Sequence, residues 1–333
     1  MSTISKVALY FPEKTFTNEA FFELFPEEKE SKTWSKLGIS QRHIIGKNEV
    51  PSDMGLKAAE KLLNEYPHLR NEIDFLIFNG HERDHYTPVT ASVLQAKLGL
   101  SERMGCIDVH QGCASFIHLV AHADGLINIG AAKKVLVVTL SSLTRQFDPK
   151  DAANRYMFGD AATAFVVEHS CTANFESYSF GNDATINDNI ILLDGESRNP
   201  INDKSFEPIV NRFGHHQIPG YFYQNGSGVF RFILDRVPQS IDETLEKSNL
   251  TRDEIDFYLF HQPNAMVLKT LSKIAKLDED KLIIDLERHG NTVSVSIPIL
   301  IHNLLKENKI KPNMNLLICG FGTGMSWNTC IWK

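Results

Sequence analysis

A short run of residues occurs twice in this chain, and the same order of expected elements follows each copy. Glu72–Phe75 reads Glu-Ile-Asp-Phe, and so does Glu254–Phe257. Each copy runs into an apolar strand, a helical pattern, a short strand, a glycine step that opens a second helix, and a closing apolar strand. Four shared residues could arise by chance, but the ordered agreement of the following elements favours an internal duplication. The chain is therefore expected to fold as two similar halves.

Strands alternate with helices in both halves, which predicts an α/β fold. The expected strands are 75–78, 104–109 and 134–138 in the first half, and 257–260, 281–286 and 315–319 in the second. Short apolar strands between helices of ten or more residues indicate βαβ units and largely buried sheets. The helix expected from Cys113 to about Ile129 is apolar on most faces, as is typical of a helix between two layers.

Composition divides the chain into three parts. The segment 171–224 is rich in Asn, Asp, Ser and Gly and has only weak periodicity, so we expect a loop-rich connection there. Residues 1–170 then form the N-terminal half, and residues 225–333 form the C-terminal half.

Charge and hydropathy exclude several classes of protein. The formal net charge of −7 has the wrong sign for a non-specific nucleic-acid binder. No apolar run reaches the roughly 18 residues that a membrane span needs, and the first residues lack a secretory signal pattern. The five cysteines are scattered without a CxxC pair, which argues against a disulfide framework or a cysteine zinc site. A cytoplasmic location is therefore expected.

Three residues able to do chemistry fall where predicted strands end or buried helices begin. Cys113 starts the buried helix of the first half, Asn291 starts that of the second, and His261 follows the strand 257–260. Ligands of open α/β sheets bind beyond the carboxyl ends of strands. A thiol at a helix N-terminus is expected to favour the thiolate. Each residue also has a structural interpretation, as a small core Cys, a structural His or a capping Asn, but their equivalent placement favours a nucleophile with its partners.

These residues also lie in motifs that resemble those of the β-ketoacyl-acyl carrier protein synthase III family. The matching stretches run in order from about residue 34 to residue 327, so the resemblance covers nearly the whole chain. Each motif is weak alone, and together they are specific. The motifs are Gly38–His43, Asp108–Phe116, Phe158–Ala162, His261–Asn264, Gly290–Thr292 with Ser296–Pro298, and Gly320–Trp327.

The resemblance implies the thiolase fold, in which two pseudo-symmetric halves form five layers, α-β-α-β-α, and usually a homodimer. It also implies an acyltransferase that needs no metal and no cofactor beyond thioesters of coenzyme A or of acyl carrier protein. Cys113 would take the acyl group, with the oxyanion held by backbone N–H groups at Cys113 and at Thr323. His261 and Asn291 would then stabilise the enolate that forms when malonyl-carrier loses carbon dioxide.

Several positions depart from the family pattern, and they point to a specialised lipid or polyketide paralogue. Ala152 stands where an arginine contacts the coenzyme A adenine, although the aromatic partner Trp34 is present and Lys36 lies near another family arginine. Met266 replaces an arginine that helps to dock the carrier protein. Thr87 stands where a bulky Phe, contributed across the dimer, often limits acyl length, so chains longer than acetyl are expected to load well.

Lysines after the His261 strand are expected to offset the loss at Met266. Lys269, Lys273 and Lys276 recur at helical spacing and would form a basic stripe for an acidic carrier protein. A merely solvated lysine face is the alternative.

Two other functions remain open at this stage. The chain could transfer an acyl group to an alcohol or amine, although the retained Asn291 favours condensation. It could instead be a non-catalytic partner subunit of a ketosynthase, but such subunits tend to lose the nucleophile, which is present here as Cys113.

Overall fold

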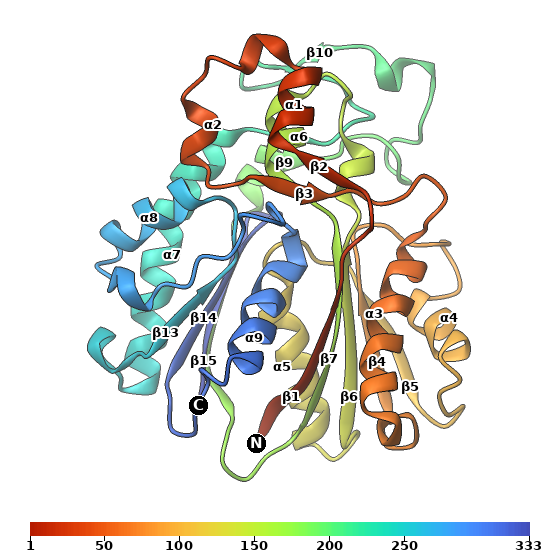
Figure 1. The fold of residues 1–333 in the computed structure, drawn as a ribbon, viewed down its shortest axis with the longest axis vertical. Helices are drawn as coiled ribbons and strands as arrows, with labels where there is room; N and C mark the ends of the chain where they lie inside the picture. Colours follow the sequence, from red (N-terminus) through yellow and green to blue (C-terminus); the bar gives the residue numbers. More distant parts are fainter.

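Two β-sheets face each other in the computed structural model, which describes residues 1–333, with helices between and outside them (Figure 1). The first sheet has the strand order β1 (Ser2–Tyr10), β7 (Ala161–His169), β6 (Lys134–Ser141), β4 (Phe75–Asn79) and β5 (Gly105–Val109). The second has the order β13 (Phe257–Phe260), β14 (Leu316–Gly322), β15 (Ser326–Trp332) and β8 (Phe175–Asn182).

The helices complete five layers, as expected for the thiolase fold. The two inner helices, α5 (Ser115–Asn128) and α9 (Ser296–Lys306), contribute to one apolar cluster with both sheets. The outer face of the first sheet is covered by α3 (Pro51–Glu65) and α4 (Thr90–Lys97). The outer face of the second is covered by α7 (Gly226–Ser248) and α8 (Ala265–Ile274). Figure 1 shows the layers from α8 and α7 on the left to α3 and α4 on the right.

The duplication is visible in the strand register. In the first half, Phe75 of β4 pairs in parallel with Val135 of β6. In the second half, Phe257 of β13 pairs in parallel with Leu316 of β14. In both pairs the last residue of the repeated Glu-Ile-Asp-Phe run lies opposite the start of the closing strand, at the second residue of β6 and the first residue of β14. The repeated residues therefore occupy equivalent places in the two sheets.

The prediction of a strand at 281–286 is wrong, because only the single bridge between Tyr258 and Leu282 forms there. A side chain takes over the pairing that a strand would provide. The amide of Gln262 donates to the carbonyls of Phe260 and Ile283 at 2.8 and 3.1 Å, and it accepts from the Asp285 N–H at 3.1 Å.

The segment 171–224 is less loop-rich than expected, since its first part is β8, the edge strand of the second sheet. Its Ser, Gly and Asn residues hide the strand pattern in the sequence. The rest holds two 3-10 helices, Ala184–Asn189 and Asp203–Phe206, and four strands of two residues each, namely β9 (Ile190–Ile191), β10 (Ile209–Val210), β11 (His216–Gln217) and β12 (Tyr223–Gln224).

Short elements cap one end of the two sheets (Figure 1). They are α1 (Asn18–Leu24), α2 (Thr33–Lys36), α6 (Ala152–Met157), β2 (Thr15–Thr17) and β3 (Gln41–His43). Arg42 is fully buried among them, with its guanidinium carbon 4.2 Å from the ring centre of Tyr156. None of the helices has the length and apolarity needed to cross a membrane.

Candidate active site

The three residues singled out at strand and helix ends line one cavity of about 350 Å³. Cys113 lies just before α5, His261 directly after β13, and Asn291 shortly before α9. The two halves of the duplication therefore each contribute to the same cavity. The fold brings together the side chains that the sequence predicted as a nucleophile and its partners.

The strand β14 holds Cys113 in place through glycine. A Cβ atom built on Gly322 would lie 2.7 Å from the Cβ and 3.1 Å from the Sγ of Cys113, and Gly322 has a φ of +155°. The side chain of Asn328, on β15, donates to the Ala114 carbonyl at 2.8 Å. The turn that carries the thiol is thus fixed against the second sheet.

Burial keeps the resting Cys113 thiol neutral, contrary to the thiolate expected from the helix N-terminus. Burial raises the pKa of Cys113 to about 12, and backbone N–H groups of Cys113 and Thr323 offset only part of that rise. Desolvation of a charge in this cavity outweighs the helix dipole and the N–H donors. The same two N–H groups are available to an oxyanion that forms next to Sγ.

Hydrogen bonds assign the proton of His261 to the nitrogen that faces away from the reaction. Nδ1 lies 2.9 Å from the Ser296 hydroxyl, and that hydroxyl donates its own proton to the Val293 carbonyl at 2.9 Å. Nδ1–H is therefore the donor, which leaves Nε2 with a lone pair. Burial lowers the pKa of His261 to about 3, so the resting imidazole is neutral.

Asn291 is held with its amide nitrogen free for the cavity. Its Oδ1 accepts from the Val293 N–H at 2.9 Å, which fixes the orientation of the amide and leaves the two N–H groups of Nδ2 as donors. The preceding Gly290 has a φ of +65°, and a Cβ there would meet the Met157 carbonyl at 2.7 Å. The glycine therefore allows the close approach that positions Asn291.

The residues expected to bind coenzyme A or limit the acyl chain lie outside this cavity. Trp34 packs on Tyr156 with ring centres 4.6 Å apart, and its indole N–H donates to Glu28 at 3.1 Å. Lys36 is exposed at the end of α2, and Thr87 is exposed in the loop after β4. Within one chain, none of these three lies together with Cys113, and Thr87 was expected to act across a dimer.

The expected lysine stripe is shorter than the spacing suggested. Lys269 and Lys273 are exposed on α8, but the helix ends at Ile274. Lys276 has a φ of +54° in the turn that ends the helix, where the Leu277 N–H bonds to the Ser272 carbonyl. It therefore does not continue the face of Lys269 and Lys273.

Met266 links that face to the cavity. Its side chain is 40 % exposed and also lines the cavity around Cys113. Since it precedes Lys269 by three residues on α8, the two lysines extend outward from the cavity mouth.

One cavity residue, His81, was missed by the sequence interpretation. It follows β4 by two residues and lines the same cavity as Cys113. The rule that singled out His261, a polar residue beyond the carboxyl end of a parallel strand, applies to His81 equally well.

Comparison with known protein families matches two parts of the chain. Residues 107–184 match the profile described as 3-Oxoacyl-[acyl-carrier-protein (ACP)] synthase III. Residues 245–333 match the profile of the C-terminal part of the same synthase.

Curated relatives and solved structures agree with those matches. Beta-ketoacyl-[acyl-carrier-protein] synthase III 2 of Staphylococcus epidermidis is 32 % identical over 97 % of this chain and 95 % of its own length. A crystal structure of a 3-oxoacyl-(acyl-carrier-protein) synthase III has a TM-score of 0.94 at 30 % identity, covering 99 % of this chain and 98 % of its own. The synthase from Burkholderia xenovorans LB400 has a TM-score of 0.89 at 30 % identity, covering 99 % and 93 %.

Proposed function

The chain belongs to the 3-oxoacyl-[acyl-carrier-protein] synthase III family, and on that premise we propose that its reaction runs through Cys113, His261 and Asn291. As a member it is an acyltransferase that condenses an acyl thioester with a malonyl thioester, and the reaction needs no cofactor beyond these thioesters. The observation that carries the residue assignment is their shared cavity, in which Sγ, Nε2 and Nδ2 have no side-chain partner.

The first half-reaction transfers the acyl group to Cys113. Sγ attacks the thioester carbonyl, the developing oxyanion accepts hydrogen bonds from the N–H groups of Cys113 and Thr323, and the carrier leaves as a thiolate. The proton that Sγ loses passes to Nε2 of His261, which has a free lone pair because the proton of the neutral ring lies on Nδ1. The departing thiolate takes a proton from water.

The second half-reaction forms the carbon–carbon bond. Malonyl-carrier loses carbon dioxide, and the electron pair of the broken bond forms an enolate whose oxygen accepts hydrogen bonds from Nδ2 of Asn291 and the protonated Nε2 of His261. The enolate carbon attacks the acyl-Cys113 carbonyl, and the sulfur leaves. Sγ then regains its proton from His261, which restores the resting enzyme.

An acyl carrier protein is the donor that the cavity mouth suits best. Lys269 and Lys273 stand exposed on the helix that carries Met266, and an acidic carrier would approach them by charge attraction. Coenzyme A has one family contact fewer here, since Ala152 replaces an arginine while the aromatic partner Trp34 is present. These departures support a specialised lipid or polyketide paralogue.

We expect acyl-carrier thioesters to acylate Cys113 faster than matched coenzyme A thioesters, and the carrier rate to fall as salt rises. Reversing both charges, in Lys269→Glu with Lys273→Glu, should slow carrier loading about tenfold at low salt. The measurement is the initial acylation rate of matched pairs at low and high ionic strength.

Lys311→Glu is the control. Lys311 is exposed and precedes β14, whereas Cys113 contacts Gly322 at the opposite end of that strand, so Lys311 lies away from the cavity mouth. It should leave both rates unchanged. Faster loading from coenzyme A, without salt dependence for the carrier, would contradict the carrier assignment.

A homodimer is supported by the edge of the first sheet. β5 is unpaired on its outer side and only half-buried along its length, and Tyr86 nearby is 73 % exposed. An unpaired edge strand is a template for pairing with a second copy. Light scattering is expected to give twice the chain mass of 37.6 kDa. A measured mass of one chain would contradict the proposal.

The five unpaired cysteines support a cytoplasmic location.

A further inference from the structure

A second cavity, of about 810 Å³, adjoins the one that contains Cys113. The two share five lining residues: His81, Leu143, Ile190, Phe222 and Thr323. Two of these lie beside the nucleophile, since a Cβ on Gly112 would be 3.1 Å from Cε1 of His81 and 2.9 Å from Oγ1 of Thr323. The space around Cys113 therefore continues past His81 into the second cavity.

The two cavities would hold different parts of one thioester, an assignment that rests on the proposed function. Met266 and the α8 lysines mark the mouth of the smaller cavity as the side from which the carrier arrives. The arm that bears the thioester then fills the smaller cavity. The acyl group on Cys113 extends the other way, toward His81 and the larger cavity.

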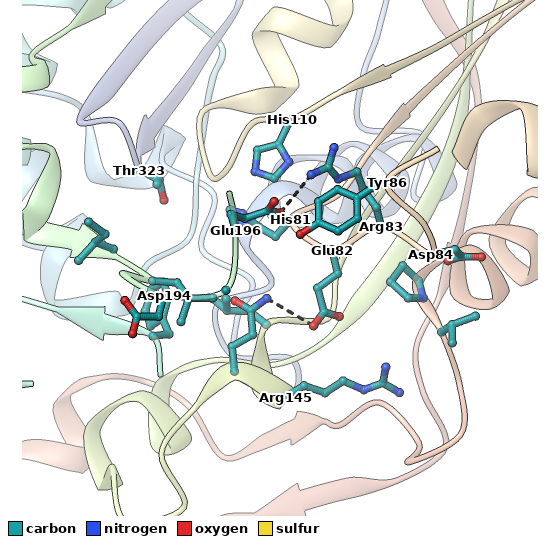
Figure 2. Close-up of a pocket in the computed structure, with 18 of the residues that line it drawn as sticks. His81, Glu82, Arg83, Asp84, Tyr86, His110, Arg145, Asp194, Glu196 and Thr323 are labelled. Carbon is teal, nitrogen blue, oxygen red and sulfur yellow. Dashed lines mark hydrogen bonds and ion pairs between the residues drawn. The ribbon is translucent and has the colours of Figure 1, made fainter. Parts of the chain in front are cut away.

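Next to Cys113 the larger cavity presents two uncharged imidazoles. The rings of His81 and His110 lie almost perpendicular, with centres 6.2 Å apart, and both residues line this cavity. Burial lowers the pKa of both, to about 4 for His81, and no hydrogen bond from the protein reaches a ring nitrogen of either residue. Figure 2 shows the two residues side by side. His81 is half-buried and His110 is exposed, so their ring nitrogens are open to the cavity, and a ligand that pairs with them gains affinity.

The charged groups of this cavity already have partners. Arg83 forms an ion pair with Glu196 at 3.1 Å (Figure 2). Glu82 accepts from the Ser142 hydroxyl at 2.6 Å and from the Gln146 amide at 3.3 Å. The five residues that the larger cavity shares with the smaller one carry no charge, since His81 is neutral and the other four are uncharged side chains. What the cavity offers beside the nucleophile is therefore hydrogen bonding.

We propose that the acyl group carried by Cys113 bears a neutral hydrogen-bonding substituent, a hydroxyl or a keto oxygen near the thioester carbon, and that His81 and His110 bind it. A neutral imidazole can donate or accept, so the pair suits either oxygen. A plain alkyl chain would leave both rings unpaired. Selectivity for the acyl group then comes from residues at the carboxyl ends of β4 and β5.

The test compares Cys113 acylation by matched pantetheine thioesters, namely butyryl, 3-hydroxybutyryl in both enantiomers, and 3-oxobutyryl. Intact-protein mass spectrometry follows the adduct with time. We expect at least one oxygenated chain to load about tenfold faster than butyryl, as two ordinary hydrogen bonds would give. His81→Leu should remove that preference, whereas His81→Asn, which keeps a donor and an acceptor, should retain most of it. His68→Leu, at an exposed histidine outside both cavities, should not alter the ratio.

Butyryl loading as fast as every oxygenated chain would overturn the inference, and so would an unchanged preference in His81→Leu. These outcomes leave the proposed function intact, because Cys113 is still acylated. Absence of any adduct on Cys113 would instead refute the proposed function together with this inference. Normal acylation without carbon–carbon bond formation from malonyl-carrier would refute the condensation alone.

Discussion

Cys113→Ala is expected to abolish the acyl adduct completely, because only this thiol lies between two N–H donors in a cavity that a thioester can enter. Cys319 and Cys330 are fully buried, and burial raises the pKa of both thiols. Cys106 is half-buried on β5, and burial raises its pKa as well. Cys171 is exposed and is the one competitor for chemical acylation.

Cys171→Ser is therefore the matched control for the nucleophile. Intact-protein mass spectrometry after exposure to an acyl thioester should show one adduct in the parent and in Cys171→Ser, and none in Cys113→Ala. An adduct that persists in Cys113→Ala would contradict the assignment. If that adduct disappeared only in the double variant of Cys113→Ala with Cys171→Ser, the exposed thiol of Cys171 would be the site of acylation.

Replacing His261 or Asn291 by alanine should lower malonyl decarboxylation about 100- to 1,000-fold, since each removes one donor to the enolate oxygen. Both variants should still acylate Cys113, because the oxyanion donors of that step are backbone N–H groups. His261→Ala should do so more slowly, since it also lacks the Nε2 that accepts the Sγ proton. Asn291→Asp is a sharper variant. It keeps the oxygen that accepts from the Val293 N–H but replaces the Nδ2 donor by an acceptor, so it should be as slow as the alanine variant.

Release of labelled carbon dioxide from malonyl-carrier measures this step, beside adduct formation as the measure of acylation. His302→Ala is the control, since His302 faces the Val7 carbonyl at 3.0 Å and lines neither cavity. Carbon dioxide release at the parent rate in both alanine variants would rule out the enolate role. Loss of acylation in Asn291→Ala would mean that Asn291 acts earlier than we propose.

The sequence predicted most of the architecture because duplication and hydrophobic patterning are local signals. The repeated run that ends at Phe75 and at Phe257 identified β4 and β13 as equivalent strands. The structure agrees, because β4 pairs in parallel with β6 and β13 pairs in parallel with β14. β8 was missed because an edge strand rich in polar residues has little apolar pattern. The strand expected at 281–286 failed because the Gln262 side chain supplies its hydrogen bonds, which no periodicity reveals.

The chemistry of the site was predictable in position but not in protonation state. Strand ends and helix starts indicated Cys113, His261 and Asn291, whereas the degree of burial depends on the packing of both sheets. Burial reversed the expected thiolate at Cys113. The tautomer of His261 depends on Ser296, which is remote from it in sequence but bonded to it in the fold.

The register shared by the two sheets has a consequence for how such a catalyst could arise. Cys113 comes from one copy of the repeated unit, whereas His261 and Asn291 come from the other. An ancestral single unit, before the duplication, could have offered a covalent acceptor or an enolate-binding pair at this position, but not both at once. The proposed division of labour between acyl capture and enolate formation therefore requires two copies that differ at this position, and the proposed site lies where the two copies meet.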